Sequence, residues 1–126
     1  MNRSAFIVGQ PVLRKPLYPL PYELKGRLRF IFQRYQIQKA WIFGSFARGE
    51  ASRHSDIDLL LVQKTERRFL DRYDGLLFEL NLAIPERALD VLIYTPEELQ
   101  NIAGRSFISQ ALKEGVSIYE SDQESL

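Results

Sequence analysis

Apolar residues in this chain recur at two spacings, one typical of helices and one typical of strands. Between residues 22 and 37 they recur every three or four positions, which predicts an amphipathic helix. Three short apolar runs, at residues 39–43, 56–62 and 88–94, are instead typical of buried strands. Strands that alternate with helices predict an α/β (α+β) fold, a small mixed β-sheet flanked by helices.

The segment between the second and third runs predicts one continuous helix over residues 65–82. Thr65 is a suitable cap for its first turn, and Pro85 would end it. Five of its apolar side chains share one face of such a helix. They are Phe69, Tyr73, Leu76, Leu77 and Leu80.

The last third of the chain carries clear helix signals. The string TPEEL, which starts at Thr95, combines a capping box with a proline in the first turn. A further short helix is predicted near residues 105–114, with Gly115 as its terminating glycine. The VSIYE string that follows predicts an edge strand.

These elements belong to one folded domain, which we predict over residues 22–120. Four prolines between residues 11 and 21 predict an extended lead-in over residues 1–21 that contacts either its own domain or a partner. Residues 121–126 are expected to be a frayed tail.

Composition narrows the function classes. The chain has 126 residues, a net charge of +1 and no cysteine, so disulfides and thiolate metal sites are excluded. The near-neutral charge gives no electrostatic case for direct nucleic-acid binding. No apolar run approaches the ~20 residues of a membrane span, and no signal peptide is visible. We therefore expect a cytoplasmic protein.

Candidate chemistry begins with two carboxylates at the start of the second apolar run. Asp56 and Asp58 point the same way in a strand, and two ionised carboxylates so close repel each other. A hard divalent cation, Mg²⁺ or Mn²⁺, is the simplest compensation. If the third strand lies alongside, Asp90 joins them, and three carboxylates at one sheet end suit an in-line displacement at phosphorus.

A second candidate feature is the Gly44-Ser45 pair after the first strand. Glycine allows close approach of a ligand to the backbone, and a helical turn that starts at Ser45 would present free N–H groups to an anion. Arg48 is a candidate cationic contact for a triphosphate. An ordinary turn at Gly44-Ser45 and an ion pair between Arg48 and Glu50 stay open as alternatives.

Together these residues resemble a known signature. Gly44-Ser45, ten intervening residues and Asp56-Ile57-Asp58 resemble the GS–x10–DxD motif of the DNA polymerase β-like nucleotidyltransferases. The longer string GSFARGEASRHSDIDLLLV resembles the minimal nucleotidyltransferases, the MNT or MntA-like group. The resemblance spans about residues 22–118 and includes the Leu-Asp-Val strand and the TPEEL string after it.

The resemblance implies a role for each candidate residue. The glycine and serine would hold the nucleotide phosphates, with the arginine close to them. The first two aspartates would bind Mg²⁺, and the third would also ligate metal and activate the acceptor hydroxyl. In this sequence the residues are Gly44, Ser45, Arg48, Asp56, Asp58 and Asp90.

The resemblance also implies a reaction and a partner. Members of this group act with a small HEPN-domain toxin, and the implied function is Mg²⁺-dependent transfer of AMP from ATP to a hydroxyl of that toxin, as its antitoxin. Because the chain ends soon after Tyr119, we expect a partner or a second copy to bind the acceptor. Two alternatives stay open, a non-catalytic module that neutralises the toxin by complex formation and a homodimeric small-molecule nucleotidyltransferase.

Overall fold

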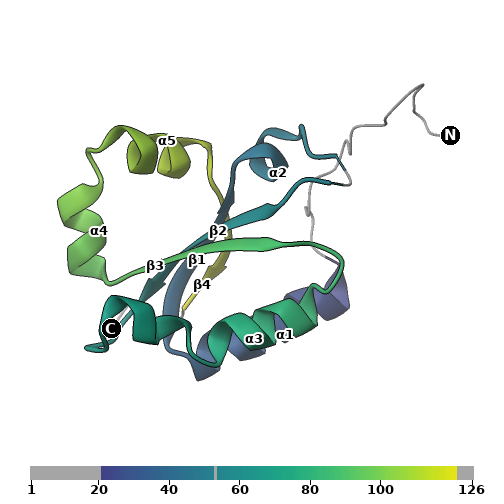
Figure 1. Cartoon of the computed structure of the whole chain (residues 1–126), viewed down its shortest axis with the longest axis horizontal. Coiled ribbons are helices and arrows are strands. Elements are labelled where there is room, and N and C mark those ends of the chain that lie inside the picture. Colours follow the sequence, from purple (N-terminus) through teal and green to yellow (C-terminus); the bar gives the residue numbers. More distant parts are fainter. Residues whose placement is uncertain (1–20, 53, 122–126) are drawn as a thin grey trace, which may run out of the picture.

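The computed structural model describes residues 21–52 and 54–121. All but the first residue of the predicted tail (residues 121–126) and all but the last residue of the predicted lead-in lie outside the described residues. The elements alternate along the chain as the sequence predicts (Figure 1). In order they are α1 (Tyr22–Arg34), β1 (Ile37–Phe43), α2 (Ser45–Arg48), β2 (Ile57–Gln63), the 3-10 helix η1 (Phe69–Tyr73), α3 (Leu76–Ala83), β3 (Leu89–Tyr94), α4 (Pro96–Ile102), α5 (Ser106–Glu114) and β4 (Val116–Glu120).

A four-stranded mixed sheet forms the centre of the domain, with strand order β3-β2-β1-β4. β1 pairs antiparallel with both β2 and β4, whereas β2 and β3 are parallel. The predicted mixed sheet, the predicted edge position of VSIYE and the adjacency of the second and third strands are confirmed. This topology brings the last residues of β1 to the same end of the sheet as the first residues of β2 and β3.

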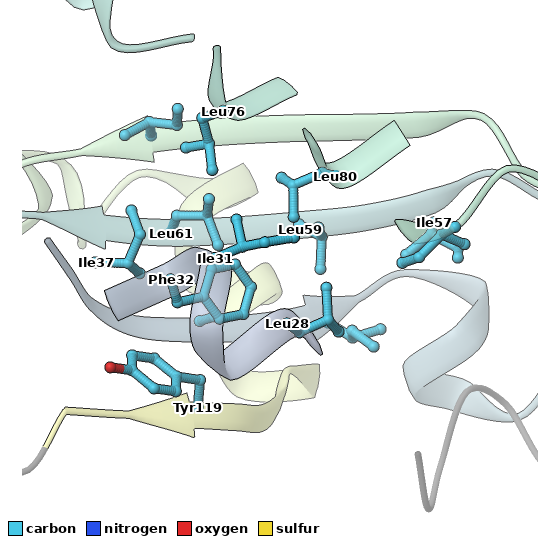
Figure 2. Close-up of a cluster of buried hydrophobic side chains, with 14 of the residues drawn as sticks. Leu28, Ile31, Phe32, Ile37, Ile57, Leu59, Leu61, Leu76, Leu80 and Tyr119 are labelled. Carbon is cyan, nitrogen blue, oxygen red and sulfur yellow. The ribbon is translucent and has the colours of Figure 1, made fainter. Parts of the chain in front are cut away.

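The larger hydrophobic core lies between one face of the sheet and the helices α1 and α3. Leu28, Ile31 and Phe32 of α1 point at the sheet, where Leu59 and Leu61 of β2 meet them (Figure 2). The period of three to four residues that predicted α1 is therefore the pattern of its buried face. These side chains are at most 3% exposed, so this layer holds the strands firmly in register.

The opposite face of the sheet is covered by α4 and α5 around a smaller cluster. Phe43, Leu60 and Ala111 are its buried members, with Trp41 and Leu92 packed beside them. Because side chains alternate along a strand, residues 58 and 90 project from this second face, together with Leu60 and Leu92. The candidate carboxylates Asp58 and Asp90 therefore lie on the less covered side of the sheet.

The prediction of one helix over residues 65–82 is wrong. The segment forms η1 and α3, with Gly75 between them at a φ of 79°. That angle is outside the helical range, and a β-carbon at this position would lie 2.8 Å from the Tyr35 hydroxyl. Thr65 does not cap a helix, because its hydroxyl accepts a hydrogen bond from the Arg67 amide in a local turn.

Smaller predictions differ at the element ends. The first helix stops at Arg34 rather than residue 37, since Gln36 adopts a φ of 58°. The capping box at Thr95 is confirmed, with reciprocal bonds between Thr95 and Glu98. Gly115 ends α5 as predicted, but its φ is −64°, so the glycine is not in the left-handed conformation expected of a terminating residue. Within the described ranges no helix is long and apolar enough to cross a membrane.

Arg72 joins η1 to the start of α4 through a half-buried ion pair with Glu98. Its guanidinium donates to both carboxylate oxygens of Glu98 at 2.6 and 2.9 Å, and to the carbonyl oxygens of Arg67 and Ile93. The Arg72 side chain is 6% exposed. Removing it leaves these acceptors without their donor.

We expect Arg72→Met to lower the free energy of unfolding by about 2 kcal/mol in urea denaturation at pH 7. The ion pair lowers the pKa of Glu98 from 4.5 to about 2. Its stabilisation is therefore present above pH 4.5 and is lost as the pH falls toward 2, so the difference from wild type should shrink over that window. Arg68→Met is the control, because the Arg68 side chain is 94% exposed. An equal effect of both variants would contradict the prediction.

Candidate active site

The turn between β1 and α2 forms the first part of the candidate site. β1 ends at Phe43, Gly44 follows at a φ of 73°, and α2 begins directly at Ser45. The turn is closed by hydrogen bonds from the Arg48 amide to the Gly44 carbonyl oxygen and from the Glu50 amide to the Ser45 carbonyl oxygen. Ser45 is thereby fixed at the end of the sheet where β2 and β3 begin.

The carboxylates form the second part. Asp58 of β2 is aligned with Asp90 of β3 on one side and with Phe43 of β1 on the other. Directly opposed residues on neighbouring strands project from the same face, so the two carboxylates lie together. Asp58 is partly buried and Asp90 is exposed, while Asp56 lies exposed one residue before β2 begins.

Asp58 is held in an environment that disfavours its charge. Burial, the negative charge of Asp90, a hydrogen bond with Asp90 and the charge of Asp56 together raise the pKa of Asp58 from 3.8 to about 6. The positive charge of Arg48 acts in the opposite direction. Burial and the repulsion from Asp90 and Asp56 therefore make ionisation of Asp58 unfavourable near neutral pH.

A contact between Gly44 and Asp58 joins the two parts of the site. A β-carbon placed on Gly44 would overlap the Asp58 Oδ2 atom. Only glycine leaves this space open, and its positive φ is likewise a conformation that side chains disfavour. The glycine of the turn is therefore needed for the position of a carboxylate that lies fourteen residues later in the chain.

The carboxylate pair suits a hard divalent cation by its chemistry, since two carboxyl groups there lie side by side and a cation would offset the repulsion that raises the pKa of Asp58. The expected set of three is not assembled. Across residues 21–52 and 54–121, no group of three or more His, Cys, Asp or Glu side chains is arranged to hold a metal ion. The structure thus brings Asp58 and Asp90 together, and the charge of Asp56 acts on Asp58 from the residue before β2.

Arg48 is engaged by two carboxylates. Its guanidinium donates to Glu50 at 2.9 Å and to Glu114 of α5 at 3.0 Å. The pairing with Glu50 is the alternative left open by the sequence. Glu114 lies 66 residues away, and its role could not be read from the local pattern. These bonds tie α5 to α2 beside the candidate site.

A protein-family model identifies the family to which this domain belongs. The model described as "Polymerase beta, Nucleotidyltransferase" matches residues 27–124, which is well over half of the chain. The chain belongs to this nucleotidyltransferase family. The resemblance found in the GS–x10–DxD spacing is confirmed, and so is the polymerase β-like nucleotidyltransferase fold.

Several solved structures share the fold of this chain. A chain of a toxin-antitoxin crystal structure with AMP-PNP superposes with a TM-score of 0.56 at 18% identity, covering 79% of this chain and 76% of the other. A chain of the toxin-antitoxin MntA-HepT gives 0.51 at 15% identity, over 82% and 76%. At such identities the likeness shows the fold alone.

A third structure of this fold contains a modified toxin. It is described as the tri-AMPylated Shewanella oneidensis HEPN toxin in complex with MNT antitoxin. The match has a TM-score of 0.50 at 15% identity and covers 82% of this chain and 75% of the other. No curated protein matches the sequence.

One residue of the nucleotidyltransferase domain was missed by the sequence analysis. The Arg87 Nη1 atom donates to the carbonyl oxygens of Ser52 at 2.6 Å and Ser55 at 3.1 Å, while its guanidinium lies 4.9 Å from the centre of the Phe46 ring. Arg87 lies just before β3. It therefore ties the start of that strand to α2 and to the loop that leads to Asp56. No sequence signal separates this arginine from a solvent-exposed one.

A separate hollow of about 1110 Å³ opens at the opposite end of the sheet. Its lining includes Gln36, Lys64 and Glu97, from the start of β1, the end of β2 and the first turn of α4. It contains none of the candidate site residues. The carboxylate edge remains the candidate active site of the nucleotidyltransferase because the titratable pair and the glycine turn meet there.

Proposed function

We propose that this nucleotidyltransferase domain transfers a nucleoside monophosphate, AMP from ATP, to a hydroxyl of a HEPN-domain toxin, as the antitoxin of the pair. The observation that carries the proposal is the meeting of Asp58 and Asp90 beside the Gly44-Ser45 turn. The neighbours described as toxin-antitoxin complexes, one with AMP-PNP and one with an AMPylated HEPN toxin, support the choice of nucleotide and partner.

The proposed roles follow the geometry. Gly44 and Ser45 would hold the phosphates at the turn after β1, with Arg48 beside them. Asp58 and Asp90, completed by Asp56, would hold Mg²⁺ or Mn²⁺. When bound, that cation would neutralise charge on the phosphates and stabilise the attacking and leaving oxygens.

The reaction requires one bond to form and one to break. The acceptor hydroxyl oxygen attacks the α-phosphorus of ATP, and the bond from that phosphorus to the bridging oxygen of pyrophosphate breaks. Pyrophosphate leaves with the electron pair, and Asp90 takes the proton of the attacking hydroxyl. Asp90 is suited to this step because it is the exposed member of the pair and is reachable by an acceptor.

The test is a transfer assay. The purified protein is mixed with Mg²⁺, α-labelled ATP and the product of the gene next to its own, tested as the HEPN-domain partner. We expect label on that protein, loss of label with EDTA, and loss with the Asp56→Asn/Asp58→Asn double variant. Asp74→Asn is the matched control, because this aspartate is 85% exposed and lies outside the candidate site.

Two results would overturn the proposal. Absence of label while the two proteins still form a complex would favour a module that neutralises the toxin by covering it. Label on hydroxyl-bearing antibiotics with the isolated protein would favour a small-molecule nucleotidyltransferase, acting as a homodimer if its acceptor site needs a second copy.

A further inference from the structure

Phe107 is an exposed aromatic ring at the edge of the candidate active site. Its side chain, on the first turn of α5, is 61% exposed, although the neighbouring Ile108 is buried at 4%. The Phe107 ring contacts the Phe43 ring edge-on, with centroids 5.9 Å apart and planes at 82°. Phe107 is thus not a core residue, and most of its surface is exposed to solvent.

The position of Phe43 places this ring next to the proposed phosphate turn. Phe43 immediately precedes Gly44, and it is aligned across the strands with Asp58. Opposed residues project from the same sheet face, so Phe107, Phe43 and Asp58 lie on one side of the sheet. The exposed ring therefore lies beside the carboxylates, on the face that α4 and α5 leave partly uncovered.

The helix that carries Phe107 is attached to the same turn. Residues 107, 110 and 114 lie along one side of α5 by helical spacing. Gln110 donates to Glu114 at 2.6 Å, and Glu114 accepts from Arg48 at 3.0 Å. This chain of bonds attaches the last turn of α5 to α2, while the ring contact with Phe43 places Phe107 next to the residue that precedes Gly44.

We propose that Phe107 is the stacking partner for the base of the nucleoside triphosphate bound at this site. The inference rests on the proposed function, which places the phosphates at Gly44-Ser45. A nucleotide bound there needs a flat apolar surface for its base, beyond the charged groups that hold the phosphates. Among the described residues, the exposed phenyl rings Phe30 and Phe78 belong to α1 and α3, on the opposite face. The remaining exposed phenyl ring, Phe69 of η1, packs against Tyr94, at the other end of β3 from Asp90.

Stacking on Phe107 predicts how the site discriminates among nucleotide bases. Every base has an aromatic face, so stacking on a phenyl ring discriminates weakly among bases. The site should therefore accept GTP as well as ATP, and it should bind purine nucleotides more tightly than pyrimidine nucleotides, whose smaller rings stack less.

The test compares a ligand that carries a base with a triphosphate that carries none. Affinities of Mg²⁺·AMP-PNP and of Mg²⁺·tripolyphosphate are measured by calorimetry with wild type and with Phe107→Ala. We expect Phe107→Ala to weaken AMP-PNP binding about tenfold and to leave tripolyphosphate binding unchanged. Phe107→Tyr should restore AMP-PNP binding, because it keeps the ring.

Phe78→Ala is the matched control, because it removes a phenyl ring that is 67% exposed on the other face of the sheet. Equal weakening of both ligands by Phe107→Ala would overturn the proposal and indicate a change in α5. Unchanged AMP-PNP affinity combined with weaker labelling of the partner would also overturn it and assign the ring to the acceptor. The proposed function itself would fail if substitution of Asp58 changed the affinity for neither ligand.

Discussion

Asp58→Asn is expected to abolish nucleotidyl transfer and, in the absence of metal, to make the protein more stable at pH 8. Both effects arise from one carboxylate that the fold holds in an unfavourable place. Burial and the charges of Asp90 and Asp56 raise the pKa of Asp58 to about 6, above its ordinary 3.8. The folded state therefore binds this proton more tightly than the unfolded state does.

The sign of the pH dependence follows from that difference. The contribution of the protonated Asp58 to stability is complete below pH 3.8 and is lost as the pH rises through about 6. Asparagine stays neutral and avoids the loss. Because Asp58 is only partly buried, solvent screening reduces the gain, and we expect about 1 kcal/mol at pH 8, or about 4 °C in Tm.

The measurement is a set of thermal melts in EDTA at pH 4 and pH 8, with transfer rates measured in Mg²⁺ at the higher pH. Wild type and Asp58→Asn should differ in Tm at pH 8 and coincide near pH 4. Loss of a carboxylate that would hold the cation should lower transfer by about 1000-fold or more. Added Mg²⁺ should raise the Tm of wild type alone.

A stable but inactive variant would place Asp58 among residues that reduce stability for the sake of function. Asp74→Asn should change neither the rate nor the Tm, since its carboxylate is 85% exposed. If Asp58→Asn lowered the Tm at pH 8, Asp58 would instead be a structural residue whose charge is compensated in the fold.

Most of the fold could be predicted because the sequence pattern and the tertiary packing agree. The period of α1 matches its buried face, and the short apolar runs match β1, β2 and β3 within two residues. The failure at residues 65–82 has a local cause. Periodicity spans Gly75 without a break, but the glycine turns the backbone to accommodate the Tyr35 hydroxyl from α1. Such a contact across the fold leaves no mark on the local pattern.

The candidate site, like the fold, could be predicted from the sequence only in part. The parallel alignment of β2 and β3 that brings Asp58 to Asp90 depends on strand adjacency, which the sequence could offer only as a condition and the structure establishes. The ion pair of Arg48 with Glu114, the contact of Arg87 with the loop before Asp56 and the exposure of Phe107 depend on segments distant in sequence. Long-range contacts of single side chains require the folded structure.

The second large effect is expected at a residue with no functional group. Gly44→Ala should lower transfer by about 100-fold or more and destabilise the protein by about 2 kcal/mol. The alanine β-carbon would occupy the space of the Asp58 Oδ2 atom, and alanine disfavours the φ of 73° at this position. Either the turn or the carboxylate must move, and both belong to the candidate site.

The matched control is Gly26→Ala, since a β-carbon on this helical glycine meets no atom within 4 Å. Alanine there should stabilise α1 by about 0.5–1 kcal/mol and leave transfer unchanged. Urea denaturation and the labelled-ATP assay measure both effects. Wild-type transfer in Gly44→Ala would show that the close approach of Gly44 to Asp58 is dispensable.

A double variant separates collision from backbone strain at Gly44. Gly44→Ala/Asp58→Ala removes the colliding carboxylate but retains the strained φ, so it should be more stable than Gly44→Ala alone. Transfer should remain absent, because the carboxylate is gone. If the double variant were as unstable as the sum of its single changes, backbone strain alone would account for the glycine. Recovery of stability without activity would instead show that Gly44 is required because it leaves room for Asp58.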